Sequence, residues 1–332
     1  MQPQSTIALG PIRRARPCGA VLLALLFAGG AARARSGDVG LDRLASEFNE
    51  RFGLVSARDA SEQFLVLAGS KADAQLVAAR AWVLKRGFDR SLRAARVWDR
   101  PTIVIIYPDE DSYRKDFVDL PGTDGGSVLT RWRAQPLRVI GTFVQDRILE
   151  EILPHEMVHL LVKDLAWSGV QTHGRKVPLW IDEGLAVALT SSAERRARDD
   201  ALVAWAMRAG QAFSFQELVA IEKYPQGEAI RVFYAQCHSI TAFLLDQPGG
   251  IDRVRTLIQY TNGAVTDRLQ QVDLAFRGQF SGHRALAAAW LSYLDAQLRA
   301  RPRHDRPLTP ERSPGPTAGT RPDAARQAGP PR

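Results

Sequence analysis

The chain has 332 residues, 45% of them hydrophobic, so it is long enough to bury a substantial core in one or two domains. Its formal net charge is +8, but residues 1–34 contribute +4 and residues 301–332 contribute another +4. The stretch between them holds 33 basic and 33 acidic side chains. The high pI therefore describes the two ends of the chain, and we expect no nucleic-acid partner.

Residues 1–34 have the pattern of a secretory signal peptide. Three arginines precede the apolar run 19–28, and Ala32-Arg33-Ala34 provides a small-residue cleavage site. The run is too short to cross a bilayer comfortably, so we expect no membrane span after cleavage and a secreted or periplasmic protein. Cys237 is then the one remaining cysteine, and we expect it to be a buried, free thiol.

Residues 35–144 predict a small mixed sheet with helices. Expected helices are 41–52, 73–85 and 112–117, and expected strands are 63–68, 102–107, 127–132 and 137–144. Strand 102–107 is an uninterrupted apolar run, which is typical of a central strand. The stretch 139–144 could be an edge strand that pairs with an extended substrate, or an ordinary interior strand.

The stretch His155-Glu156-Met157-Val158-His159 is the feature around which the rest of the chain is interpreted. Two histidines four residues apart lie on one face of a helix and can reach one metal ion. In zinc hydrolases this spacing supplies two ligands, and the intervening glutamate is the general base. The alternative is a core helix with two partly buried histidines. Pro154 indicates either that the helix begins near this residue or that a longer helix from Asp146 is kinked there.

A third ligand is predicted at Glu183, separated from His159 by 23 intervening residues, in a helix that follows Pro178. Two histidines and one glutamate leave the fourth tetrahedral position of a catalytic zinc free for water. Asp182 and His173 are the next candidates. The alternative for Glu183 is an ordinary acid in the first turn of a helix.

The second part of the chain, residues 145–300, predicts mostly helices. The expected segments are 199–208, 215–222, 227–245, 250–260, 265–276 and 282–298. Gly184, Ala186 and Ala188 are small enough to let their helix approach another closely. Residues 301–332 are rich in proline and arginine, and we expect them to be disordered.

The His155–His159 motif, followed by Trp180-Ile181-Asp182-Glu183-Gly184-Leu185-Ala186, resembles the gluzincin zinc metallopeptidases, and most closely the secreted bacterial peptidase MA-like group. A looser similarity continues through residues 233–245, and the resemblance covers roughly residues 60–300. It implies an α+β fold in which a mainly helical, zincin-like half follows the sheet, and one catalytic domain over residues 35–300. It also implies Zn²⁺ held by His155, His159 and Glu183. The gap between the second histidine and the glutamate is longer than in thermolysin-type enzymes, which we attribute to a loop at 167–176.

The expected chemistry is hydrolysis of a peptide or protein substrate with Glu156 as the base. Tyr234 and His238 lie one helical turn apart and are the candidates for stabilising the oxyanion. For each, the alternative is a structural role, with the tyrosine packed and the histidine at the surface. Trp180 is expected to be a packing residue.

Two other functions stay open on the sequence alone. One is a non-catalytic, peptidase-like envelope protein that binds peptides or a protein partner. The other is a zinc hydrolase that acts on a non-peptide amide. The sequence makes no prediction of the oligomeric state.

Overall fold

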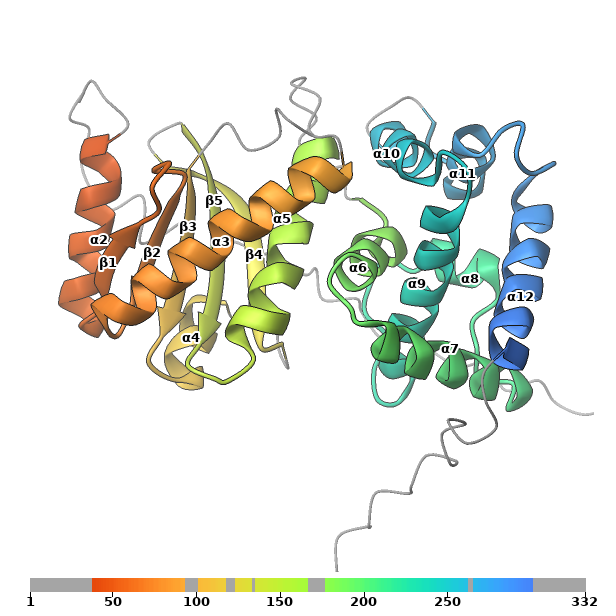
Figure 1. The fold of residues 1–332 in the computed structure, drawn as a ribbon, viewed down its shortest axis with the longest axis horizontal. Helices are drawn as coiled ribbons and strands as arrows, with labels where there is room; N and C mark the ends of the chain where they lie inside the picture. Colours follow the sequence, from red (N-terminus) through yellow and green to blue (C-terminus); the bar gives the residue numbers. More distant parts are fainter. Residues whose placement is uncertain are drawn as a thin grey trace, which may run out of the picture.

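A computed structural model describes residues 38–92, 101–117, 123–132, 135–166, 177–261 and 265–300. The chain forms a sheet-containing N-terminal half and a helical C-terminal half, which lie side by side (Figure 1). The strands are β1 (Val55–Arg58), β2 (Phe64–Ala68), β3 (Thr102–Tyr107), β4 (Gly125–Trp132) and β5 (Gln135–Phe143). The expected α+β class is confirmed, while the zincin-like character of the helical half stays a prediction.

The five strands among the described residues form one mixed sheet in the order β1-β2-β3-β5-β4. β2, β3 and β5 run parallel, whereas β1 and β4 pair antiparallel at the two edges. β5 therefore has a neighbour on each side, so of the two alternatives for 139–144 the interior strand is confirmed and the edge strand is wrong. The edge strand on that side is β4, which folds back on β5 as a hairpin.

Helices cover both faces of the sheet, which explains the uninterrupted apolar sequence of β3. Val104 and Ile106 point into the main core, beneath α3 (Lys71–Leu92) and α5 (Leu153–Ala166). Ile103 and Ile105 point into a second core, which includes residues of α2 (Asp38–Phe52) and α4 (Glu110–Asp116). A strand with both faces buried has no polar alternation to show.

The C-terminal half consists of helices that share the main core with the sheet. Their bounds are α6 (Leu179–Ala188), α7 (Ala193–Arg208), α8 (Phe215–Ala220), α9 (Ala229–Asp246), α10 (Gly250–Tyr260), α11 (Arg268–Ala275) and α12 (His283–Ala300). α5 contacts both β4 and α6, and so it joins the two halves of the molecule (Figure 1).

Most expected elements are present, with bounds that differ by a few residues. The helices α3 and α7 are longer than expected, and β1 was not predicted. Cys237 is buried and free, as expected. The predicted signal peptide (1–34), the loop at 167–176 and the tail (301–332) lie outside the described residues. No helix in the described part of the chain has the length and apolar character needed to cross a membrane.

α5 begins one residue before Pro154, so the proline lies in the first turn of this α-helix. A short π-helical segment, η1 (Ile148–Ile152), leads directly into it. Both of the alternatives drawn from Pro154 are thus partly right, because the α-helix starts at Leu153 and helical backbone also precedes it.

Gly184 lets α6 approach α9 closely. A Cβ atom at this position would lie 2.1 Å from Thr241 Oγ1 and 2.5 Å from the carbonyl oxygen of Cys237. Because the second contact is with backbone, it could be relieved only by moving one of the two helices. The expectation that small residues bring α6 against another helix is confirmed at Gly184, next to the predicted ligand Glu183.

We predict that Gly184→Ala destabilises the fold by about 1–3 kcal/mol through overpacking, measured by urea unfolding. Gly87→Ala is the control, since a Cβ there meets no atom within 4 Å in the middle of α3. It should be neutral or stabilising by up to about 1 kcal/mol. Equal effects of the two substitutions would contradict the close approach of α6 and α9.

Candidate metal centre

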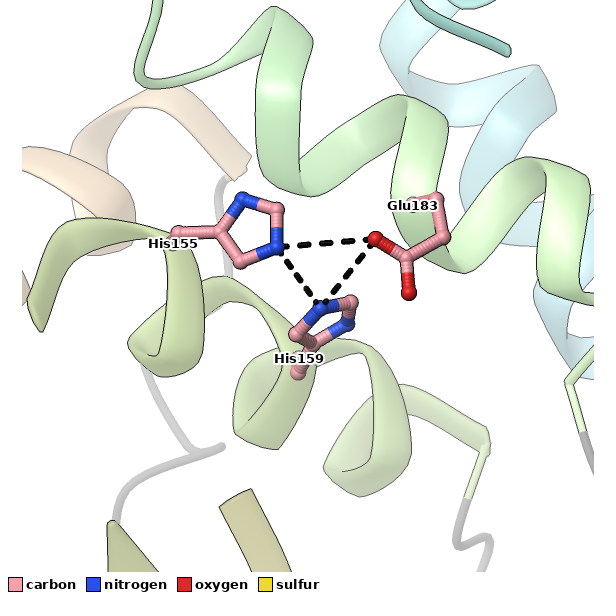
Figure 2. A group of neighbouring side chains, drawn as sticks. All are labelled: His155, His159 and Glu183. Atoms are coloured by element: carbon pink, nitrogen blue, oxygen red, sulfur yellow. Dashed lines mark hydrogen bonds and ion pairs between the residues drawn. The ribbon is translucent and has the colours of Figure 1, made fainter. Parts of the chain in front are cut away.

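α5 presents two imidazole rings on one face, as the four-residue spacing requires. The Nε2 atoms of His155 and His159 lie 3.1 Å apart, and their ring planes are nearly perpendicular, at 84°. The side chain of His159 is 9% exposed and that of His155 is 24% exposed. Both rings turn the same nitrogen toward one point (Figure 2).

α6 brings Glu183 to that point from the other half of the molecule (Figure 2). Its Oε2 atom lies 3.5 Å from Nε2 of His155 and 3.6 Å from Nε2 of His159. The residue is only 2% exposed, and Oε2 has no hydrogen-bond partner among the described residues. A buried carboxylate oxygen without a hydrogen bond is costly, and a cation bound at this point would offset that cost.

The spacing of the three atoms fits a tetrahedral metal ion. Ligands about 2.0–2.2 Å from a tetrahedral centre are separated from one another by about 3.3–3.6 Å. The observed separations are 3.1, 3.5 and 3.6 Å. A triangle with these sides has its three corners about 2.0 Å from a common centre, which is the reach of a zinc–imidazole bond. His155, His159 and Glu183 form the metal-competent cluster found among the described residues.

The electrostatics of the cluster favour positive charge. Burial lowers the pKa of His159, but the carboxylates of Asp182 and Glu183 outweigh burial and raise that pKa from 6.5 to about 9. Burial raises the pKa of Glu183, but the two histidines, His159 foremost, bring that pKa from 4.5 down to about 2.

Asp182, the alternative ligand, lies behind His159. Its Oδ1 atom is 2.7 Å from Nδ1 of His159, on the side of the ring that faces away from the cluster. A carboxylate in this position fixes the tautomer in which Nδ1 carries the proton and Nε2 is free to bind a metal. Asp182 is therefore placed to orient a ligand, while Glu183 occupies the ligand position. The other alternative, His173, lies outside the described residues.

Tyr224, in the connection between α8 and α9, was missed in the sequence analysis. Its hydroxyl donates a hydrogen bond to Oε1 of Glu183, the oxygen that does not face the histidines. Its ring lies 6.2 Å from that of Tyr234, at an interplanar angle of 29°. Burial, followed by the charge of Glu183, raises the pKa of Tyr224 far above its usual range, so the hydroxyl keeps its proton.

A cleft of about 2130 Å³ passes over the cluster and is lined by both halves of the molecule. Glu156, one residue after the first histidine, is 7% exposed and lines this cleft. Gly125 of β4 lies beside it, because a Cβ at Gly125 would be 3.5 Å from Oε1 of Glu156 and 2.5 Å from Ile152. The edge strand therefore passes next to the predicted base, which the sequence did not indicate.

The structure separates the two oxyanion candidates. Tyr234 lines the cleft, whereas His238 is 1% exposed and does not belong to the residues that line it. Nδ1 of His238 lies 2.6 Å from Oδ2 of Asp199, so this histidine is a buried partner of α7 and is not a surface residue. Trp180 is 1% exposed and packs edge-on against Phe215, in agreement with its expected packing role.

No protein-family model and no curated protein matches the chain. The proposal of a metal site therefore rests on the geometry of the three side chains. The resemblance to gluzincins therefore stays a prediction.

We predict that Asp182→Asn weakens zinc binding by about 10–100-fold, because the amide no longer fixes the metal-binding tautomer of His159. The dissociation constant is measured by competition with a chelator. Asp295→Asn, in the same cleft but ion-paired with Arg299, is the control and should leave affinity unchanged. An unchanged constant for Asp182→Asn would contradict the orienting role.

Tyr224→Phe should also weaken zinc binding about 10–100-fold, since Glu183 loses the bond that orients its carboxylate. Tyr234→Phe is the matched control, because it removes a hydroxyl from the neighbouring ring that makes no hydrogen bond with the described residues. Equal affinities for the two variants, from the same competition assay, would show that the Tyr224 bond does not support the ligand.

Proposed function

We propose that this chain is an exported, zinc-dependent metallopeptidase of the gluzincin type. One observation carries the proposal: three ligand atoms from two helices lie at the spacing of a tetrahedral metal site, and one of them is a buried carboxylate oxygen with no hydrogen-bond partner among the described residues. The three side chains come from two consecutive helices, α5 and α6, which pack against each other. A packing role for the histidines would not require this convergence.

The donor set favours zinc over other divalent ions. Two imidazoles and one carboxylate suit zinc, whereas magnesium and calcium prefer sites built from oxygen ligands alone. Bound there, zinc would act as a Lewis acid toward a carbonyl group and would lower the pKa of a water molecule to about 7. His155, His159 and Glu183 would hold it, with Asp182 and Tyr224 keeping two of these ligands in orientation.

Glu156 is the residue proposed to move the proton. Its carboxylate lies in the cleft beside the cluster, where it can accept a proton from the attacking water and deliver it to the departing amine. Tyr234 is the proposed oxyanion donor. Burial, followed by the charges of Glu183 and Glu156, raises its pKa above the usual range, so its hydroxyl stays protonated and can donate.

The outer edge of β4 pairs with no other strand among the described residues, and it supports the proposal of a peptide substrate. The carbonyl oxygen of Ser127 accepts a hydrogen bond from Nζ of Lys163 at 2.8 Å, as a carbonyl turned away from β5 can. The backbone groups of Gly125, two residues earlier, face the same side, because strand residues alternate. An extended peptide can add to such an edge and pass close to Glu156.

We predict about one zinc per purified chain and a peptide-cleaving activity that Glu156→Gln lowers by about 10²–10⁴-fold in kcat/KM while the zinc is retained. Metal content is measured by elemental analysis, and cleavage with a library of quenched fluorescent peptides. Glu150→Gln is the control, because Glu150 lines the same cleft but is paired with Arg80.

The other functions correspond to distinct outcomes of this experiment. Zinc and peptide binding without turnover would indicate the non-catalytic, peptidase-like envelope protein. Hydrolysis confined to non-peptide amides would indicate the third possibility. A chain that takes up no zinc would overturn the proposal altogether.

A further inference from the structure

α7 turns one polar and aromatic face toward the cleft. Eight residues of this helix line it, and five of them follow one another at a spacing of three or four positions, which places these five on one side. They are Arg195, Arg198, Leu202, Trp205 and Arg208. The cleft reaches them from the metal centre along the end of α6, since Val187 and Thr190 also line it.

Trp205 forms the centre of this face. Its side chain is half-buried, and its indole N–H makes no hydrogen bond with the described residues. Leu202, Ile230 of α9 and Leu298 of α12 are also half-buried in the lining of the same cleft. A partly open aromatic surface beside other apolar side chains is a typical wall of a ligand pocket.

The cations on this side of the cleft are not neutralised. Arg198, Arg208 and Lys223 line the cleft and form no ion pair or hydrogen bond with the residues that the structure describes. The acids on the same side already have partners. Asp199 lies 2.6 Å from His238, and Asp295 is paired with Arg299.

The opposite wall, which includes the end of β4 and η1, carries acids that are all paired. Asp124 and Glu151 both interact with Arg147, and Glu150 lies 2.8 Å from Arg80. Apart from the metal centre with its base, the charge that lines the cleft without an acidic partner among the described residues is therefore positive; it lies on the α7 side except for Lys163, whose Nζ donates to the carbonyl oxygen of Ser127.

We propose that the α7 side of the cleft binds acidic side chains of the substrate peptide, next to an apolar residue that packs on Trp205. The proposal rests on the function proposed above and adds its substrate class. A guanidinium fork matches a carboxylate with two parallel hydrogen bonds, and cations that line one wall of a cleft concentrate anionic ligands there. Peptides rich in aspartate or glutamate therefore bind in preference to basic ones.

The test measures binding and does not depend on turnover. Fluorescein-labelled peptides of equal length, carrying glutamate, glutamine or lysine at the same positions, are titrated by fluorescence anisotropy against the zinc-loaded Glu156→Gln chain. The acidic peptide should bind about three- to tenfold more tightly than the neutral one, and the lysine peptide most weakly. The difference should shrink as salt is raised, because the charges are exposed.

The double variant Arg198→Glu/Arg208→Glu should abolish or reverse the preference, and the milder Arg198→Gln/Arg208→Gln should reduce it. Arg284→Glu, which replaces an exposed arginine of α12 outside the cleft, should leave it intact. No peptide binding, no charge preference, or a preference that survives the double variant would overturn the inference. Failure of the wild-type chain to cleave any peptide, with the binding preference intact, would instead refute the peptidase proposal alone.

Discussion

The arrangement on which the rest of the structure depends is the burial of Glu183 against two imidazole rings. An anionic carboxylate with 2% exposure, one oxygen of which has no hydrogen-bond partner among the described residues, is stable only next to positive charge. The surroundings are organised accordingly. The fit of Gly184 against α9 sets the position of α6, Asp182 fixes the far nitrogen of His159, and Tyr224 occupies the other oxygen of the carboxylate. Each contact limits one way in which the three ligand atoms could separate.

The sequence predicted the parts of this centre that follow from local periodicity. Two histidines four residues apart must share a helical face, and the helix after Pro178 was expected because proline suits a first turn. Glu183 could be predicted as a ligand because it lies in this expected helix. The strand 102–107 could be assigned because its unbroken apolar run matches a strand buried on both faces.

Other features depend on tertiary contacts that leave no local signal. Tyr224 lies in a short connection without periodicity, so nothing in its neighbourhood indicates a bond to a residue 41 positions away. His238 appears equivalent to Tyr234 on a helical wheel, yet α7 covers it and Asp199 binds it. Strand order is likewise not encoded in any single strand, which is why β5 could be taken for an edge when β4 holds that place.

The residues proposed for catalysis and those proposed for substrate recognition line the same cleft. The outer edge of β4 passes the proposed base on one side. On the other lies an aromatic face with two arginines, Arg198 and Arg208, that form no ion pair with the described residues. The first can bind any extended backbone, whereas the second discriminates by charge. Because the two halves of the molecule contribute one wall each, the metal centre at their junction is placed where a bound chain would meet both.

The most direct test of the account is the zinc K-edge X-ray absorption spectrum of the purified, zinc-loaded protein. The account predicts nitrogen and oxygen ligands at about 2.0–2.2 Å, with the outer-shell scattering of two imidazoles, and its loss in His155→Ala/His159→Ala. A sulfur ligand at about 2.3 Å, or a shell of oxygens without imidazole scattering, would contradict it.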